Sequence, residues 1–361
     1  MAKIDSLKIL AFTNMTASHK WRLTPIAQRL NEQTDHEMAI FDYGKWNGST
    51  VGADIVIIEL LTAPKLVEEC HKQGAKVIFE ADDAFIDTYG RERKNLQHMG
   101  EGWRKNAIET IKLVDALTVT NTYLKENFAR FTDKPIHILP NYIDTNWYVK
   151  QKLIFKRNTD EVRIGWFGSK GHFEDMKMVI PALKRVLEKY PQAKFVYCGF
   201  GGMSSDRLVT EVGWGEDVFK EIPRHRREFV TAVPEDLWPM KHMTLDFDIG
   251  IAPLIDDPFN HCKSQIKWME YGALGVPAVC SPTVYGESPF SPTKPTVSHG
   301  KDGFIATTEE DWYQYLCQLV ENKTLRQKMG EAARKNIFTN WNIDKHWNKW
   351  VQVYQSVIDK R

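Results

Sequence analysis

The stretch His261-Cys-Lys-Ser-Gln-Ile-Lys-Trp-Met-Glu-Tyr-Gly-Ala-Leu-Gly-Val-Pro-Ala-Val-Cys-Ser281 predicts a helix that leads into a buried strand. Lys263, Lys267 and Glu270 are spaced i, i+4 and i+7, so one helical face would carry all three. Two lysines in the first turns lie against the positive end of the helix dipole, which is unfavourable unless an anion binds there. A phosphate would supply the charge and accept hydrogen bonds from the free N–H groups. The alternative is a solvated Lys/Lys/Glu face.

Length and composition narrow the class of protein. A chain of 361 residues is more typical of two domains than of one. Its 48 basic and 47 acidic residues nearly balance, so net charge does not indicate a nucleic-acid-binding protein. The five cysteines have no paired spacing, which predicts reduced thiols in a cytoplasmic protein without a structural zinc site. We find no apolar signal region and no run of about 18 apolar residues that would span a membrane.

Apolar runs typical of strands alternate with amphipathic helical segments in both halves of the chain. Strands are expected at 7–13, 53–61, 76–80, 116–120, 136–139, 163–168, 194–198, 227–233, 245–252 and 276–280. Helices are expected at 25–31, 64–72, 106–114, 123–131, 173–190, 311–320, 325–337 and 345–358. This alternation predicts an α/β protein with parallel sheets that are covered on both faces.

The alternation stops once, in a polar segment. Residues 150–161 are charged and have no clear period, so we interpret them as a linker. The expected domains are therefore 1–149 and 162–340, with a final helical segment, 341–361, that packs back on the first domain. Two such halves facing each other would form an interdomain cleft, where ligands commonly bind.

Three loops that follow predicted strands carry unusual residues. The segment 13–22 contains His19, Lys20 and Arg22 at the mouth of the first domain, and 80–83 contains the carboxylates Asp82 and Asp83. Adjacent carboxylates after a buried strand need a cation, a hydroxyl or a proton as partner. In 165–172, two glycines allow close backbone approach to a ligand. The possible donors to an oxyanion in that loop are Ser169, Lys170 and His172. Solvated surface loops are the alternative for the first two segments.

Together these pieces resemble GT-B fold glycosyltransferases, in particular the retaining class that includes glycogen synthases (glycosyltransferase family 4). The similarity rests on the order of segments 140–144, 163–172, 247–254, 263–277 and 299–305, and covers most of 160–345 and more loosely 6–145. It implies two Rossmann-like parallel-sheet domains that face an interdomain cleft. It also implies transfer of a hexose or pentose from a nucleotide-diphosphate-sugar, UDP-linked, to an acceptor hydroxyl, with retention and without a metal.

The resemblance also implies roles for individual residues. Glu270 matches the acidic residue that binds the ribose, and Lys263 and Lys267 would face the diphosphate and stabilise charge. The other donor-binding residues implied are Gly168, Ser169, Lys170, His172 and Ser264. Asp82 and Asp83 lie where the first domain contacts the acceptor or the sugar. The family's acidic pair is spaced Glu-x7-Glu, but Cys262 stands at the first position, which leaves the donor sugar unassigned.

The acceptor is expected to bind the first domain. A basic stretch with interspersed aromatics suits a polyanion, either DNA or a phosphate of a lipid-linked sugar. Its expected contacts, with those of the first loop, are His19, Lys20, Arg22, Arg91, Arg93, Trp103 and Arg104. Without a basic amphipathic helix near the N-terminus, we favour hydroxymethylated bases of phage DNA over a cell-surface polysaccharide or lipopolysaccharide. A nucleotide-sugar epimerase and a noncatalytic GT-B binding protein are the alternatives of other classes.

Overall fold

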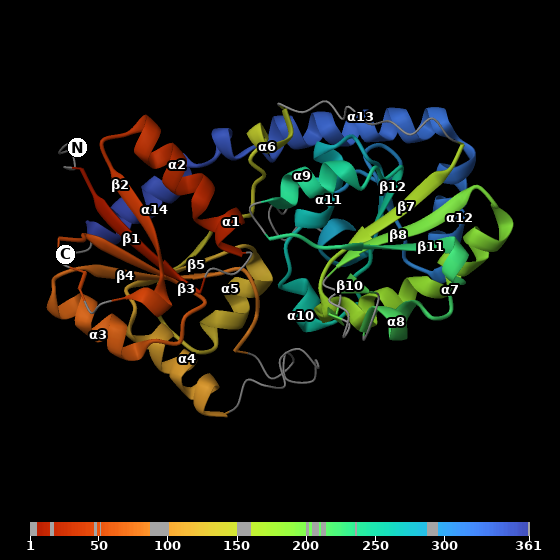
Figure 1. Ribbon diagram of the computed structural model, residues 1–361. Coiled ribbons are helices and arrows are strands. Elements are labelled where there is room, and N and C mark those ends of the chain that lie inside the picture. The colour runs from red at the N-terminus through yellow and green to blue at the C-terminus, as the bar shows by residue number, and fades with distance from the viewer. Residues whose placement is uncertain are drawn as a thin grey trace. The chain divides into compact units, whose positions relative to one another are not determined.

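The computed structural model describes residues 6–14, 18–46, 49–50, 52–86, 101–149, 160–199, 202–203, 209–210, 214–234, 237–286 and 295–359 (Figure 1). The chain forms two compact units. The first comprises Met1–Asp144, His261–Ser264 and Asn342–Arg361, and the second comprises Thr145–Asn260 and Gln265–Trp341. Most of the expected linker, 150–161, lies outside the described residues, so the sequence-based domain boundaries stay a prediction.

The described part of the first unit contains a six-stranded parallel sheet in the order β2-β1-β3-β4-β5-β6. Its strands are β1 (Lys8–Thr13), β2 (Glu37–Asp42), β3 (Ile55–Glu59), β4 (Lys76–Ala81), β5 (Ala116–Val119) and β6 (Ile136–Ile138). Its helices are α1 (Ser18–Arg22), α2 (Thr24–Gln33), α3 (Pro64–Lys72), α4 (Glu101–Leu113), α5 (Thr122–Ala129) and α14 (Asn348–Ile358). The strand order reverses between β1 and β3, which makes their carboxyl ends the expected ligand site of this sheet.

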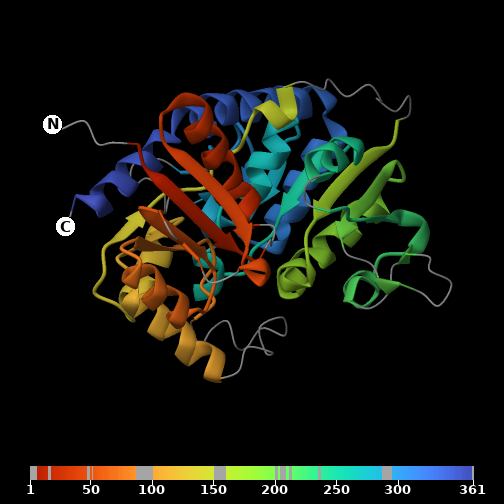
Figure 2. The same cartoon turned by 60° about the vertical axis from the view of Figure 1, so that its left-hand side comes forward.

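The end of the chain packs on this first sheet through buried charge and aromatic contacts. Arg29 binds Asp144 through both terminal nitrogens, at 2.5 and 2.8 Å, and its Nε donates to Asp344 at 2.8 Å. The Trp350 ring of α14 lies 5.4 Å from the Arg22 guanidinium. Both views show α14, in blue, along the part of the sheet that carries β1 and β2 (Figures 1 and 2).

The described part of the second unit contains a six-stranded parallel sheet in the order β11-β8-β7-β12-β13-β14 and a two-stranded antiparallel pair. The sheet strands are β7 (Val162–Phe167), β8 (Ala193–Gly199), β11 (Arg227–Thr231), β12 (Ile249–Ala252), β13 (Ala278–Cys280) and β14 (Phe304–Ile305), and the pair is β9 (Gly202–Met203) with β10 (Val209–Thr210). The helices are α6 (Asn146–Val149), α7 (Phe173–Lys189), α8 (Trp214–Phe219), α9 (Trp238–Thr244), α10 (Pro258–His261, whose last residue belongs to the first unit), α11 (Ile266–Ala273), α12 (Glu309–Glu321) and α13 (Lys323–Asn340). Here the order reverses between β7 and β12, as in dinucleotide-binding sheets.

One expectation about local structure was wrong, and several elements were not predicted, among them strand β2. Helix α11 begins at Ile266, so Lys263 lies before the helix and does not share its face with Lys267 and Glu270. The cause is a distant side chain, because Asn121 Nδ2 donates to the carbonyl oxygens of His261 and Lys263 at 3.1 and 2.9 Å. Strand β2 was not predicted, because it forms the edge of its sheet and lacks a continuous apolar run.

The core of the second unit leaves no room for a side chain at one glycine. A Cβ atom on Gly165 of β7 would lie 2.1 Å from the Phe247 ring, so only glycine fits there. All five cysteines are buried and none is in a disulfide.

We predict that Gly165→Ala lowers the free energy of unfolding of the second unit by about 1–3 kcal/mol, because the added methyl group overlaps Phe247. Gly102→Ala is the control, since nothing lies within 4 Å of its added Cβ. Urea unfolding measures both variants, and equal midpoints for Gly165→Ala and the unsubstituted protein would refute the packing argument.

Candidate functional site

A buried carboxyl group lies at the strand-order reversal of the first sheet. Glu59, the last residue of β3, is 2% exposed, and Ser18 Oγ donates to its Oε1 at 2.9 Å. Its Oε2 has no hydrogen-bond partner among the described residues. Burial raises the pKa of Glu59 to about 8, with smaller contributions from Asp82 and Glu80, while Thr13 and Ser18 lower it. The group therefore holds a proton at neutral pH.

The neighbouring strand carries a buried ion pair. Glu80 of β4 accepts from Arg22 Nε at 2.8 Å and from Thr118 Oγ1 at 2.6 Å. Arg22 is completely buried, and its Nη1 also donates to Asn141 at 2.9 Å. Residues 18–22 form helix α1, in which Arg22 contacts Glu80, and its expected role as an acceptor contact stays a prediction.

Of the other acceptor contacts expected in this segment, His19 is also buried, whereas Lys20 is partly exposed.

The predicted acidic pair follows β4 directly. Asp83 binds Lys263 Nζ through both oxygens at 2.8 Å. Burial and the charge of Asp83 raise the pKa of Asp82 to about 7, while Arg22 and Lys263 lower it. Lys263, expected at the diphosphate, is therefore the partner of a first-unit carboxylate in this structure. The two aspartates differ, since one is paired and the other titrates near neutral pH.

The strand-order reversal of the second sheet carries a histidine. His172, which follows β7, has its Nδ1 2.7 Å from Asp175 Oδ2 and its Nε2 3.4 Å from Lys267 Nζ. Gly168 makes room for this ring, because a Cβ there would lie 2.6 Å from Trp166 and 3.3 Å from His172 Cδ2. We expected Gly168 to approach a ligand, and the structure shows a packing reason for the glycine as well.

The remaining donor-binding candidates differ in environment. Ser169 is exposed, the side chain of Lys170 lies outside the described part, and Ser264 is partly exposed in the segment before α11.

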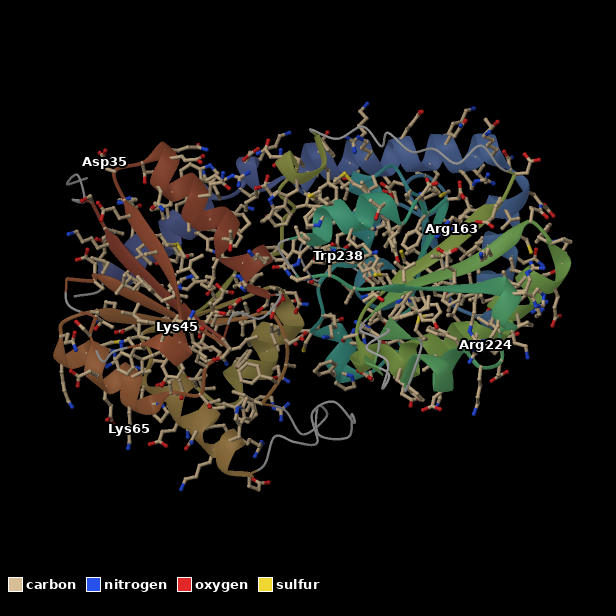
Figure 3. All side chains as sticks on the ribbon, viewed as in Figure 1. Asp35, Lys45, Lys65, Arg163, Arg224 and Trp238 are labelled. Carbon is tan, nitrogen blue, oxygen red and sulfur yellow. The ribbon has the colours of Figure 1, made fainter. Side chains whose placement is uncertain are left out.

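Lys267 and Glu270 lie on helix α11. The Lys267 ammonium lies 5.7 Å from the Trp166 ring and 5.3 Å from the Phe167 ring. Glu270 is 2% exposed and accepts from Trp238 Nε1 at 2.5 Å. Trp238 lies on α9 (Figure 3). Burial raises the pKa of Glu270 to about 8, against the lowering effects of Trp238 and Lys267.

Sequence reasoning missed Asp175. It is completely buried, and its Oδ1 accepts from Ile255 N at 3.0 Å and from Asn260 Nδ2 at 2.8 Å. Asp175 thus joins the loop after β7 to the loop after β12. A histidine directly before a helix with an aspartate three residues later was the available signal.

Comparisons with known proteins identify the fold. No protein-family model matches the sequence, and no curated protein is similar to it. Among solved structures, a sucrose-phosphate synthase from Thermosynechococcus elongatus is 10% identical, with a TM-score of 0.70 over 98% of this chain and 100% of that chain. HepE from Anabaena, in complex with UDP and glucose, is 13% identical, with a TM-score of 0.62 over 97% and 100%. A putative UDP-N-acetylglucosamine 2-epimerase from Listeria monocytogenes is 13% identical, with a TM-score of 0.57 over 99% and 98%.

The chain has the GT-B fold of glycosyltransferases. Each unit contributes one of the two parallel sheets of this fold, as the sequence predicted. The residues singled out at the carboxyl ends therefore lie where such sheets bind ligands.

Several acceptor candidates of the GT-B first unit are not placed in a site. Arg91 and Arg93 lie outside the described residues, as do their basic neighbours Lys94 and His98. Trp103 packs edge-on against Phe85, with ring centroids 5.3 Å apart. Arg104 donates to the Ile86 carbonyl oxygen at 3.0 Å, and its guanidinium lies 5.8 Å from the Phe131 ring. Trp103 and Arg104 thus contribute to packing.

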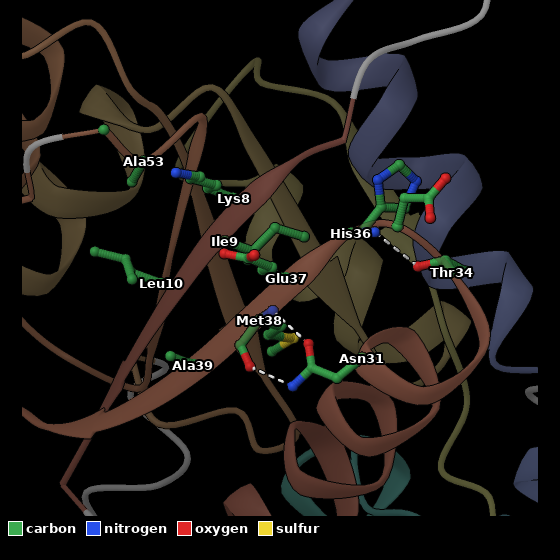
Figure 4. Close-up of a pocket in the computed structure, with 12 residues that line it drawn as sticks. Lys8, Ile9, Leu10, Asn31, Thr34, His36, Glu37, Met38, Ala39 and Ala53 are labelled. Carbon is green, nitrogen blue, oxygen red and sulfur yellow. Dashed lines mark hydrogen bonds between the residues drawn. The ribbon is translucent and has the colours of Figure 1, made fainter.

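Two cavities lie at the other ends of the strands. One, of about 420 Å³, is lined by Lys8, Glu37 and Ala53 near the amino ends of β1, β2 and β3 (Figure 4). The other, of about 350 Å³, is lined in the second unit by residues that include Asp160 and Asp248, just before β7 and β12. Neither is lined by a candidate site residue.

No group of three or more His, Cys, Asp or Glu side chains in the described part of the chain could hold a metal ion. No helix there is both long and apolar enough to cross a membrane.

We predict that Glu59→Gln flattens the pH dependence of stability. The raised pKa means that the folded state binds more protons than the unfolded state between pH 4.5 and about 8. Glu59 therefore stabilises the fold fully below pH 4.5, and this contribution is lost as the pH rises to about 8, with a slope of at most about 1.4 kcal/mol per pH unit.

Urea unfolding at pH 5 to 9 measures this difference. Glu68→Gln, at an exposed position of the same unit, should give a profile parallel to that of the unsubstituted protein. A Glu59→Gln profile with the unchanged slope would show that Glu59 is ionised in the folded state.

Proposed function

We propose that the protein is a glycosyltransferase that moves a sugar from a UDP-linked donor to an acceptor hydroxyl, with retention and without a metal. One observation carries the proposal: His172, Lys267 and Glu270 lie on elements that meet at the β7/β12 end of a GT-B second-unit sheet. Parallel sheets of this order bind nucleotides at that end. The HepE structure, which holds UDP and glucose, supports the choice of nucleotide.

The donor site proposed here combines charge and hydrogen bonding. Lys267 would contact the diphosphate, with Gly168, Ser169 and Lys170 supplying the loop after β7 and His172 holding the Lys267 ammonium. Glu270 would accept from the ribose hydroxyls through the oxygen that Trp238 does not occupy. Lys267 lowers the pKa of Glu270, but burial keeps it at about 8, so the carboxyl group holds a proton at neutral pH before the nucleotide binds.

Group transfer requires one bond to form and one to break. The acceptor oxygen attacks the anomeric carbon, the bond from that carbon to the diphosphate oxygen breaks, and the acceptor proton passes to the leaving diphosphate on the same face. Lys267 would stabilise the charge that develops on that group. Asp82, with a pKa of about 7, would orient the acceptor hydroxyl and is able to exchange its proton.

The assay that tests this function has a donor arm and an acceptor arm. UDP-sugars are incubated with duplex DNA that contains hydroxymethylated bases, with a polysaccharide or with a lipid-linked sugar, and product and UDP are measured. The proposal requires UDP release together with labelled acceptor. The DNA and glycan arms separate the two acceptor classes that the sequence left open.

Epimerisation of the donor is the second candidate, favoured by the structural similarity to a putative epimerase over nearly the whole chain. It predicts an epimer of the UDP-sugar in the absence of any acceptor. Sugar transfer without epimer formation would exclude it.

We predict that Lys267→Ala weakens UDP binding more than tenfold, because a hydrogen bond to a charged group contributes about 1.5–3 kcal/mol. Lys335→Ala, at an exposed position of α13 in the same unit, is the control and should leave the affinity unchanged. Isothermal titration calorimetry measures both variants. Equal UDP affinity for Lys267→Ala and the unsubstituted protein would contradict the phosphate assignment.

We predict that Asp82→Asn reduces turnover at least tenfold while UDP affinity stays the same, because the amide cannot exchange the proton and one oriented hydrogen bond is lost. Steady-state transfer rates and UDP titrations separate these effects. Asp133→Asn, at an exposed position of the first unit, serves as control. Loss of UDP binding in Asp82→Asn would place Asp82 at the donor instead.

A further inference from the structure

Asp175 connects several groups at the β7/β12 end of the second sheet. Its Oδ2 faces His172 Nδ1, and its Oδ1 accepts from the backbone of Ile255 and from Asn260 Nδ2. The side chain is completely buried. A buried carboxylate is costly unless hydrogen bonds compensate its charge, and here those bonds come from both loops that border the strand-order reversal.

These contacts favour one tautomer of the neutral His172 ring. The Lys267 ammonium has only donors, so His172 Nε2, 3.4 Å away, must be the acceptor in that contact. The proton of the neutral ring is then on Nδ1, from which it is donated to Asp175 Oδ2 at 2.7 Å. Lys267 thus faces a nitrogen lone pair instead of a second N–H group.

We propose that Asp175 is a positioning residue for Lys267, the cation of an anion-binding site, and that it acts through His172. By accepting the Nδ1 proton, Asp175 fixes the ring so that Nε2 holds the Lys267 ammonium at the end of β7. This inference rests on the proposed function, in which the anion is the diphosphate of the donor. Asp175 does not touch the ligand and acts through His172, as carboxylates behind metal-binding and catalytic histidines do.

A purely structural role is the competing explanation, because Asp175 lies in the first turn of α7, where an acidic residue favours the helix dipole. That role predicts a loss of stability in variants but no change in the His172 tautomer. The hydrogen bond of Oδ2 reaches the imidazole ring, which the helix dipole does not require.

Asp175→Asn tests the proposal with nearly the same shape. The amide oxygen can still accept from Ile255 and Asn260, which turns the amide NH2 group toward His172 Nδ1. Nδ1 must then accept, the proton moves to Nε2, and two donors face each other at Lys267. We expect the ¹⁵N signals of His172 to change from the Nδ1–H to the Nε2–H pattern, and UDP affinity to fall about tenfold, as for one lost hydrogen bond to a charged group.

The measurements use the ¹⁵N-histidine-labelled full chain at pH 8, with His172 assigned by the signal lost in His172→Gln. The control is Asp248→Asn, because Asp248 accepts a backbone hydrogen bond from Arg163 N at 2.9 Å, at the amino end of β7. It should change neither the His172 signal nor UDP affinity.

Several outcomes overturn the proposal. A proton on Nε2 in the unsubstituted protein would overturn it. That measurement needs no variant, so the proposal can be tested even if Asp175→Asn fails to fold. An unchanged tautomer in Asp175→Asn would also overturn the proposal. So would a changed tautomer with unchanged UDP affinity. If the unsubstituted protein binds no UDP, the proposed function fails, and the tautomer measurements still decide the role of Asp175.

Discussion

A parallel sheet covered on both faces can collect polar side chains only at the ends of its strands, because an unpaired charge within the layers is too costly. In both units this constraint concentrates titratable groups where the strand order reverses. Glu59 lies at the β1/β3 reversal and Asp175 at the β7/β12 reversal, each almost completely buried. The strand order thus determines where chemistry is possible in each unit.

The buried carboxyl groups at the two strand-order reversals differ in their hydrogen-bond partners. Asp175 has hydrogen-bond donors for both of its oxygens, whereas Glu59 has a partner for one oxygen and a pKa raised to about 8. A carboxylate with several donors fixes the groups around it, and a carboxyl group that holds a proton can exchange it. In the proposed function, the first unit would exchange protons beside Asp82, and the second would hold Lys267 and His172 in fixed positions for an anion.

Much of the fold followed from sequence because buried strands such as β3 begin as continuous apolar runs. Strand β2 did not, because an edge strand is apolar on one face only. The start of α11 depends on hydrogen bonds from Asn121, which lies 140 residues from His261 along the chain and has no local signal there. The inward turn of Arg22 depends likewise on Glu80, from another element. Spacing on a helix predicted which residue types matter, but it could not show which distant groups they bind.

Hydrogen–deuterium exchange with and without UDP tests most directly whether the nucleotide binds at the β7/β12 end of the second sheet. If UDP binds there, exchange should be slower in the loop 168–172, in 253–260 and in the first turn of α11. It should not change around Asp248 and 274–277 at the opposite end. Slower exchange at that opposite end, with no slowing in 168–172, would contradict UDP binding at the β7/β12 end.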